Sequence, residues 1–329
     1  MYHCYMRVYQ GIKRAVITGV GGQDGILSSQ LLIYRGYEVI GFTREISREV
    51  ADFGQLHKNF KIVQCNGSYF NELKRTIQEF KPNLILHWAA PQPKQVSQDE
   101  GRAIDFAELS LKAIYEAAAI IKSVNGYIKV LVPGTSEFFA KDGLPKTVFS
   151  EVIGKTPYAR NKLLFRKLAR ELASKYQIDT LFPIFYSHDS PLRNRTYLSK
   201  QIYYFMQKQK KENVSFSVGP LSTRRDWSWA PEVVSLVVDE LHATEGYREI
   251  IVGHGKLTSI VELINLFAVE MHIDDDFWLN ISIDNSFVPY EELEGSYADP
   301  HYSVLTTLNP VEWVSQYVKT AETLSFNFK

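Results

Sequence analysis

The sequence predicts an α/β protein built on a doubly wound parallel sheet, with a smaller, partly interleaved C-terminal region. Short β-branched runs alternate with longer helical patterns through the first half of the chain, which is typical of parallel βαβ units. These runs are apolar along their whole length, as in strands that are covered on both faces. A glycine-rich segment also joins the first run to the first helical pattern.

The expected elements follow from this alternation. Strands are expected at residues 15–18, 38–42, 61–64, 84–87, 127–132, 180–185 and 249–252. Helices are expected at residues 25–35, 71–80, 103–122, 158–176, 198–211 and 231–243. The alternation breaks after about residue 186, and the tail from residue 274 is expected to be irregular.

Length and charge narrow the class of protein. The 329 residues suggest about two domains, at roughly 150 residues each. The 37 basic and 37 acidic residues cancel, which argues against non-specific nucleic-acid or acidic-membrane binding, because such binding needs a surplus of positive charge. A local basic patch stays open. Cys4 and Cys65 match no metal or disulfide motif. No apolar run reaches about 18 residues, and residues 1–14 do not predict a secretory signal, so we expect a cytoplasmic protein.

The glycine-rich segment has the spacing GxxGxxG between a strand and a helix. Glycines there permit a tight turn and let the backbone approach a pyrophosphate at the positive end of the helix. A glycine-rich turn without a ligand is the alternative. The pattern favours a Rossmann-type dinucleotide site, and the expected cofactor residues are Gly19, Gly22, Gln23, Asp24 and Gly25.

The end of the second strand bears on the choice of cofactor. Arg44 stands there and Glu45 follows it. An arginine accommodates the 2′-phosphate of NADP, whereas an acidic residue holds the 2′-hydroxyl of NAD. The order favours NADP, with NAD as the second choice and an exposed Arg–Glu turn as the alternative without a ligand.

A tyrosine and a lysine, Tyr158 and Lys162, share one face of an expected helix. A lysine ammonium beside a phenol lowers the pKa of the phenol, so the tyrosine can act as a general acid or base. Tyr204 and Lys208 repeat the spacing, and we interpret them as a solvated helix face. The segment Thr135-Ser136-Glu137 is expected to end a strand, which would bring hydroxyl, carboxylate and phenol together at the carboxyl edge of the sheet.

Together these motifs resemble the extended short-chain dehydrogenase/reductases, and most closely the GDP-mannose 4,6-dehydratase group of nucleotide-sugar dehydratases. The matching stretches occur in family order and read ITGVGGQDG (17–25), GYEVIG (36–41), TSE (135–137), TPYARNKL (156–163), HDSP (188–191) and RDW (225–227). GQDG, TSE and the HDSP/RDW pair are specific to this group, whereas GxxGxxG and YxxxK mark only the superfamily.

The resemblance implies a reaction in which a hydride leaves the sugar and returns to it. Tyr158 would remove the 4-hydroxyl proton while C4 gives hydride to the nicotinamide, and Glu137 would take the C5 proton as water leaves C6. Thr135 would polarise the oxygen on C4, Lys162 would orient the ribose and tune Tyr158, and Ser136 would help water leave. The alternative for Glu137 is a charge at a strand end that pairs with a neighbour.

The resemblance also implies cofactor and substrate contacts. Asn66 stands where an aspartate usually meets the adenine, and Ala89 lies in the loop beside the nicotinamide. Guanidinium groups suit a diphosphate, and the expected substrate-binding residues are Ser187, His188, Arg193 and Arg225. A solvated basic loop is the alternative for Arg193, and a packed, hydrogen-bonded histidine is the favoured interpretation of His87 and His188.

Several positions depart from the family pattern. His87 replaces an asparagine, Gly134 a serine, Phe139-Ala140 a Tyr-Gly pair and Ser187 an asparagine, while Phe287-Val288-Pro289 lacks an arginine. A different sugar, such as a heptose, or a different nucleotide therefore stays open.

The sequence thus predicts an NADP-dependent nucleotide-sugar 4,6-dehydratase. The alternatives are a nucleotide-sugar 4-epimerase, dehydrogenase or reductase, and a cofactor-binding protein without activity. Residues 12–185 with about 227–258 are expected to hold the dinucleotide, and residues 186–226 with 259–329 the nucleotide sugar. Family members pair through helices equivalent to 103–122 and 158–176, which implies a homodimer or homotetramer. No nucleic acid, membrane or metal is expected as a partner.

Overall fold

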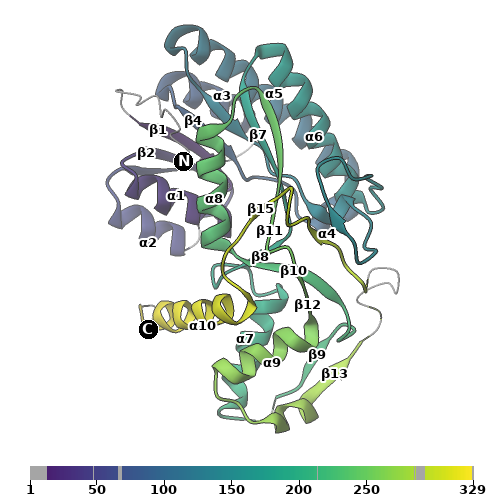
Figure 1. Ribbon diagram of the computed structural model, residues 1–329. Coiled ribbons are helices and arrows are strands. Elements are labelled where there is room, and N and C mark those ends of the chain that lie inside the picture. The colour runs from purple at the N-terminus through teal and green to yellow at the C-terminus, as the bar shows by residue number, and fades with distance from the viewer. Residues whose placement is uncertain are drawn as a thin grey trace, which may run out of the picture.

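An eight-stranded sheet forms the centre of the described structure (Figure 1). The computed structural model describes residues 13–46, 48–65, 69–212, 214–284, 286 and 293–327. The strand order is β15-β11-β7-β5-β4-β1-β2-β3, and neighbouring strands are parallel throughout. The strands are β1 (Arg14–Thr18), β2 (Glu38–Thr43), β3 (Phe60–Gln64), β4 (Leu84–His87), β5 (Lys129–Leu131), β7 (Asp179–Phe185), β11 (Tyr247–Gly253) and β15 (Val304–Leu305). The predicted α/β fold with a parallel sheet is confirmed.

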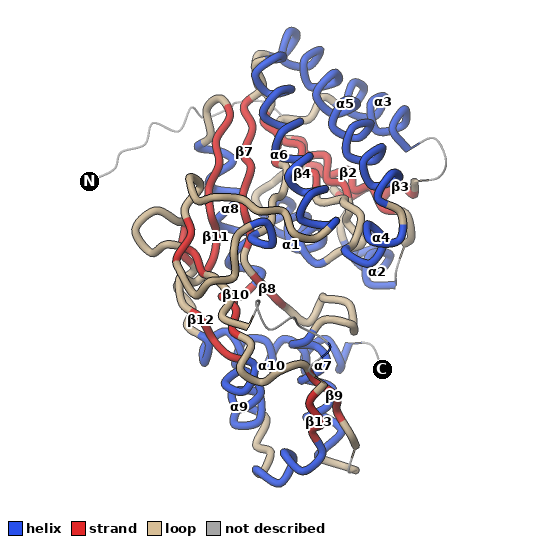
Figure 2. Tube along the Cα trace, turned by 90° about the vertical axis from the view of Figure 1, so that its right-hand side faces the viewer, coloured by secondary structure: helices blue, strands red, loops and turns tan. Residues whose placement is uncertain are grey.

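Helices cover both faces of this sheet (Figure 2). They are α1 (Gln23–Tyr34), α2 (Arg48–Leu56), α3 (Tyr69–Phe80), α5 (Glu100–Asn125), α6 (Pro157–Tyr176) and α8 (Ala230–Ala243). Successive residues of a strand face opposite sides. On β1, Val16 therefore lies in the core beneath α3, α5 and α6, whereas Ile17 lies in the core beneath α1, α2 and α8.

The ends of several elements differ from the expected ones. Helix α1 begins at Gln23, two residues before its expected start, because Gly22 already ends the turn as its N-cap. Strand β5 covers only Lys129–Leu131 of the expected 127–132. Four helices were not predicted from the sequence: α2, α4 (Pro93–Gln98), α9 (Ile260–Glu270) and α10 (Pro310–Asn327).

A third core lies below the sheet in Figure 1 and is built mainly from α7 (Leu198–Gln209), α9 and α10 (Pro310–Asn327). Trp313 and Tyr317 of α10 pack edge-on against Phe267 of α9. The expectation of an irregular tail from residue 274 is therefore wrong for α10. The apolar residues of that helix do recur at helical spacing, at Trp313, Val314, Tyr317, Val318 and Ala321.

Short strands connect this third core to the central sheet. They are β6 (Pro145–Lys146), β8 (Ser187–Asp189), β9 (Phe216–Val218), β10 (Arg224–Trp229), β12 (Leu257–Ser259), β13 (Ile281–Ile283) and β14 (Tyr297–Ala298), with the 3₁₀ helices η1 (Ser136–Phe138) and η2 (Asp275–Asn280). Asp226 of β10 is fully buried and accepts the backbone N–H groups of His254, Gly255 and Ala298 at 2.7, 2.9 and 3.0 Å. These bonds hold the loop after β11 and strand β14 against β10, beside Arg225.

No helix among the described residues is long and apolar enough to cross a membrane. Their histidine, cysteine and acidic side chains form no group of three or more suited to a metal ion.

Candidate active site

The glycine loop between β1 and α1 is packed so tightly that side chains would not fit. Gly19 has φ +74°, and a Cβ there would lie 2.8 Å from the backbone N of Ala89. A Cβ on Gly25 would lie 2.4 Å from the Gly19 carbonyl oxygen. The N–H of Gly19 donates to the carbonyl of Phe42 on β2 at 2.8 Å. The loop therefore lies directly over the carboxyl ends of β1, β2 and β4.

This loop fits the pyrophosphate of a dinucleotide. Gly22 is the N-cap of α1 and contributes no side-chain cap to the first-turn amides. Those amides carry the positive end of the helix dipole and can donate to an anion. Ala89 reaches the loop because its N–H donates to Thr18 Oγ1 at 3.1 Å. Arg44 is exposed at the end of β2, next to this loop.

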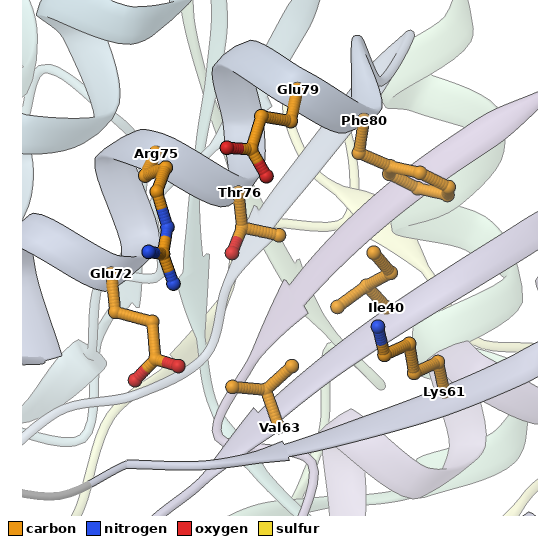
Figure 3. A pocket seen from close by; sticks show the side chains of 8 residues that line it. All are labelled: Ile40, Lys61, Val63, Glu72, Arg75, Thr76, Glu79 and Phe80. Atoms are coloured by element: carbon orange, nitrogen blue, oxygen red, sulfur yellow. The ribbon is translucent and has the colours of Figure 1, made fainter.

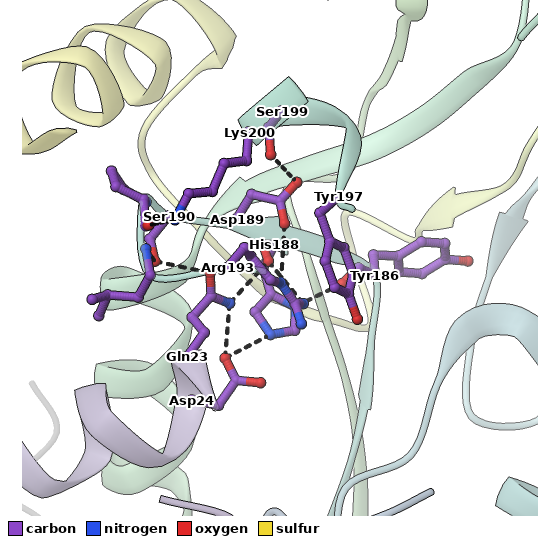
Figure 4. Close-up of polar contacts among 12 residues, drawn as sticks. Gln23, Asp24, Tyr186, His188, Asp189, Ser190, Arg193, Tyr197, Ser199 and Lys200 are labelled. Atoms are coloured by element: carbon purple, nitrogen blue, oxygen red, sulfur yellow. Dashed lines mark hydrogen bonds and ion pairs between the residues drawn. The ribbon is translucent and has the colours of Figure 1, made fainter. Parts of the chain in front are cut away.

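Gln23 and Asp24 open α1, and their side chains hold the segment that begins at β8 (Figure 4). Gln23 Nε2 donates to the carbonyl of His188 at 3.2 Å and to Asp24 Oδ1 at 3.0 Å. Ser190 Oγ donates to Gln23 Oε1 at 2.8 Å. These side chains bond to other groups of the protein. The cofactor role expected of them stays a prediction.

His188 has both ring nitrogens against acceptors. Nε2 lies 3.2 Å from Asp24 Oδ1, and Nδ1 lies 2.9 Å from the carbonyl oxygen of Tyr186. Burial raises the pKa of Asp24, but His188 and Arg193 lower it more, so Asp24 is held ionised. His188 is thus the packed, hydrogen-bonded histidine that was favoured.

Arg193 is fixed by its own segment. Its Nε donates to Asp189 Oδ1 at 3.1 Å, and its guanidinium lies 4.4 Å from the ring centroid of Tyr197. Tyr197 donates in turn to Gln92 Oε1 at 3.2 Å. The arginine is 20% exposed at its side chain and is not a solvated loop residue. Its substrate role, like that of half-buried Ser187 on β8, stays a prediction.

His87 ends β4 and is fully buried. Its Nδ1 lies 2.8 Å from Thr18 Oγ1 and its Nε2 lies 3.1 Å from Ser110 Oγ. Burial and the nearby Lys162 lower the pKa of His87 to about 3, so the ring is neutral. The interpretation of His87 as a packed histidine is confirmed.

Tyr158 and Lys162 lie in the first turns of α6, which begins at the N-cap Thr156 with Pro157 next. Lys162 is 3% exposed, and its Nζ donates to the carbonyl of Pro133 at 3.1 Å. The same Nζ lies 6.0 Å from the ring centroid of Tyr158. Burial lowers the pKa of Lys162 to about 8. The two side chains therefore share one face, as the spacing predicted.

The expectation that Lys162 lowers the pKa of Tyr158 stays a prediction, while the net shift of the phenol pKa in this structure is upward. Burial raises the pKa of the phenol, and Tyr197 and Glu137 raise it further. Arg193 and a hydrogen bond with Thr135 lower it by less. Lys162 directs its ammonium group to the Pro133 carbonyl.

The segment Thr135-Ser136-Glu137 lies beyond the strand that it was expected to end. β5 stops at Leu131, although Gly134 N–H still donates to the Pro183 carbonyl at 2.8 Å. Thr135 then caps η1 by accepting the N–H of Glu137 at 3.3 Å. A Cβ at Gly134, where the resemblance led us to expect a serine, would lie 2.6 Å from the ring of Phe182.

Glu137 forms an ion pair with Lys141, at 3.1 Å between Oε1 and Nζ. The Glu137 side chain is 40% exposed, whereas that of Lys141 is 7% exposed. Burial raises the pKa of Glu137, but Lys141 and then Arg225 lower it more, and the net shift is downward. The pairing with a neighbour that we considered as the alternative does occur. It also keeps Glu137 in the ionised form that a base needs.

Lys141 was missed in the sequence. The signal was present, because Glu137 and Lys141 are four residues apart. A spacing of four indicates an ion pair only in a helical segment, and this segment was expected to end a strand and not to form the helical turn η1.

Arg225 is half-buried on β10, donates to the Arg224 carbonyl at 2.8 Å and lies near enough to Glu137 for its charge to lower the pKa of that carboxyl. Asn66 and the Phe287-Val288-Pro289 segment lie outside the described residues. A cavity of about 320 Å³ between α3 and strands β2 and β3 contains none of the predicted site residues (Figure 3).

Comparison with known proteins adds the family. The family model described as GDP-mannose 4,6 dehydratase matches residues 16–284. The chain belongs to the GDP-mannose 4,6-dehydratase family. The family expected from the sequence, and with it the expected 4,6-dehydratase function at the level of the family, is confirmed.

Curated relatives of this family cover most of the chain. The chain is 27% identical to GDP-mannose 4,6 dehydratase 2 of Caenorhabditis elegans over 286 residues, which is 81% of this chain and 72% of that protein. It is 26% identical to GDP-mannose 4,6-dehydratase of Vibrio cholerae over 277 residues, which is 80% of this chain and 74% of that protein.

Solved structures share the fold. A dTDP-glucose 4,6-dehydratase from Bacillus anthracis in complex with NAD has a TM-score of 0.76 at 16% identity, covering 94% of this chain and 97% of that one. A UDP-glucuronic acid 4-epimerase from Bacillus cereus has a TM-score of 0.78 at 17% identity, covering 94% and 99%. At such identities these likenesses establish the fold alone.

Proposed function

We propose that the chain is an NADP-dependent 4,6-dehydratase of GDP-mannose or a related GDP-sugar. The product would be a 4-keto-6-deoxy sugar nucleotide. The observation that carries the proposal is Glu137, a carboxylate held ionised near Tyr158 and Thr135. A 4-epimerase or ketoreductase needs the tyrosine and lysine but removes no proton from C5, so it has no use for this carboxylate.

The residues of this chain divide the reaction between them. A bound nicotinamide dinucleotide supplies the acceptor for the hydride from C4 and its return to C6. Tyr158 takes the proton of the 4-hydroxyl, and Thr135, which lies near the phenol, polarises the same sugar oxygen. The ketone at C4 acidifies the C5–H bond. Glu137 takes that proton while the hydroxyl on C6 leaves, and Lys162 orients the ribose.

The cofactor contacts are part of the proposal. The backbone of Gly19, Gly22 and Gly25 would receive the pyrophosphate, and Ala89 would lie beside the nicotinamide. Arg44 favours NADP over NAD because it is exposed at the end of β2, where a 2′-phosphate would lie. Gln23, Asp24 and Asn66 complete the predicted cofactor set.

The substrate contacts are proposed on the same footing. Arg225, Arg193 and Ser187 would hold the sugar nucleotide, with the guanidinium groups toward the diphosphate. His188, whose ring nitrogens both lie against protein acceptors, would position the segment that begins at β8. Residues 12–185 with about 227–258 would hold the cofactor, and 186–226 with 259–329 the sugar nucleotide. A homodimer or homotetramer and a cytoplasmic location complete the proposal.

The test is turnover with defined sugar nucleotides. The purified protein, loaded with NADP, is incubated with GDP-mannose and other GDP-sugars, without added reductant, and the products are identified by mass spectrometry. We expect a 4-keto-6-deoxy product. Glu137→Gln should lower the rate of its formation by about 10²–10⁴-fold, the range for loss of a general base.

Other outcomes identify the alternatives. Stoichiometric reduction of the cofactor with release of an unreduced 4-keto sugar, or a 4-epimer as product, would contradict a dehydratase. No turnover of any nucleotide sugar by protein that binds NADP would favour the cofactor-binding protein without activity.

A further inference from the structure

The proposed reaction leaves one proton without a donor. When water leaves C6, the departing oxygen must gain a proton, while Glu137 takes a different proton from C5. Ser136 stands beside the base, yet a serine hydroxyl is not among the side chains that commonly transfer protons at neutral pH. This inference rests on the proposed function and concerns the identity of that acid.

The cations near Glu137 differ in whether they can release a proton. Lys141 and Arg225 are the two whose charges lower the pKa of Glu137. An arginine guanidinium keeps its proton in proteins, whereas a lysine ammonium can release one. Lys162 is committed to the Pro133 carbonyl at 3.1 Å. Among the described cations that act on Glu137, Lys141 is thus the one that can act as an acid.

The geometry of the Glu137–Lys141 pair suits an elimination across adjacent carbons. Oε1 and Nζ lie 3.1 Å apart, so a base and an acid face neighbouring atoms from one side. The ammonium is almost enclosed at 7% exposure, while the carboxylate is 40% exposed. Enclosing an ammonium costs free energy unless it is paired. A weak second contact, 3.5 Å from Nζ to the Ser136 carbonyl, also points it along η1.

We propose that Lys141 is the general acid that protonates the oxygen leaving C6. Glu137 takes the C5 proton, the electrons of that C–H bond form the C5–C6 double bond, and the C6–O bond breaks. The oxygen leaves as water with a proton from the Lys141 ammonium. C6 then regains its hydride and Glu137 returns its proton to C5. The proton that Tyr158 took from the 4-hydroxyl restores Lys141, so the turnover releases one water and leaves every group as it began.

Lys141→Arg separates the two roles that the lysine can have. The arginine keeps a positive charge beside Glu137 but cannot release a proton. In deuterated buffer we expect Lys141→Arg to oxidise C4 and to exchange the C5 hydrogen for deuterium. Formation of the 4-keto-6-deoxy product should fall by about 10²-fold or more, and the absorbance of the reduced nicotinamide should accumulate. Glu137→Gln should accumulate the same absorbance without deuterium at C5.

A matched control lies in the same loop. Lys146 pairs with Asp142 at 2.7 Å, also four residues apart, with side-chain exposures of 9% and 40%. Lys146→Arg should leave product formation within a few-fold of wild type, which shows that replacing an enclosed lysine does not by itself stop elimination. Thermal unfolding of both variants checks that they fold.

The outcomes are distinct. Product formation by Lys141→Arg within a few-fold of wild type would overturn the proposal, because charge alone would then suffice. Loss of both C5 exchange and product would also overturn it, since the lysine would then act only through Glu137. If wild type itself neither forms product nor reduces the cofactor, the proposed function has failed, and this is seen before any variant is measured.

Discussion

Single residues in the site carry charges that burial alone would remove. Lys162 is held by the Pro133 carbonyl although burial lowers its pKa to about 8. Glu137 shows the opposite balance, because Lys141 and Arg225 outweigh the effect of burial. The motifs predicted Lys162 and Glu137 as site residues. They did not predict these shifts, or that burial raises the pKa of Tyr158, because a shift depends on everything that surrounds the group.

Lys162 should make wild-type stability depend on pH. Below about pH 8 it is protonated in both the folded and unfolded chain, and the folded state carries the cost of the buried charge. Between pH 8 and 10.5 only the unfolded chain binds this proton, so stability rises with pH there. Lys162→Met should therefore be more stable than wild type at pH 7, by on the order of 2 kcal/mol, and inactive.

Urea unfolding at pH 7 and pH 10 checks this prediction. The advantage of Lys162→Met should shrink at the higher pH. Lys208→Met is the control, because Lys208 is exposed on α7 and follows Tyr204 with the same spacing. An advantage that does not change with pH would contradict a buried, protonated Lys162.

At the scale of elements, regular hydrophobic spacing and the residues at element ends were sufficient to predict most strands of the sheet and most of its helices. They did not predict α10, because the acidic and aromatic residues around it obscured its helical spacing. The apolar face of α10 contacts α9 and α7 in the third core. The Thr135–Glu137 segment shows a second failure. It forms a helical turn because Thr135 caps it, which a strand-end interpretation did not anticipate.

The turn into α1 should be intolerant of any side chain at Gly25. A Cβ there would meet the Gly19 carbonyl oxygen at 2.4 Å and the Val20 Cα at 2.6 Å, both of them backbone atoms that cannot rotate away. Gly25→Ala should therefore reshape the loop and weaken dinucleotide binding by at least about tenfold, a loss of roughly 1.4 kcal/mol. Titration calorimetry with NADP measures it.

The control for Gly25 lies in the first turn of α5. A Cβ on Gly101 would come no closer than 3.6 Å, to Asp99 Oδ1. Gly101→Ala should bind NADP as wild type does and be slightly more stable, because alanine favours a helix. Unchanged NADP affinity in Gly25→Ala would show that the loop does not form the pyrophosphate site.

At the scale of the whole molecule, one surface bears on assembly. α5 exposes large apolar side chains along its length, with fractional exposures of 38%, 47%, 47% and 66% at Ile104, Leu109, Ile120 and Val124. These residues lie on the helix that family resemblance implied as a pairing surface. Exposed apolar surface of this kind favours association, since burial removes it from water.

We predict that wild type is at least a dimer and that Ile120→Glu with Val124→Glu makes it a monomer. Two carboxylates in an apolar interface would oppose association, because each would be desolvated without a partner. Light scattering over a range of concentrations gives the mass. Val269→Glu is the control, since Val269 is 75% exposed on α9, away from α5. A wild-type monomer at every concentration would refute the prediction.

By itself, the sequence determined the fold class, the glycine loop and the Tyr158–Lys162 face. Each of these features depends on residues a few positions apart in the sequence, and such local spacing sets the conformation of a turn or a helix face. Only the tertiary structure showed which distant residues these side chains contact. Asp24 meets His188 across 164 residues, and Asp226 holds Ala298 across 72. Such contacts depend on how distant elements pack, which short-range patterns do not encode.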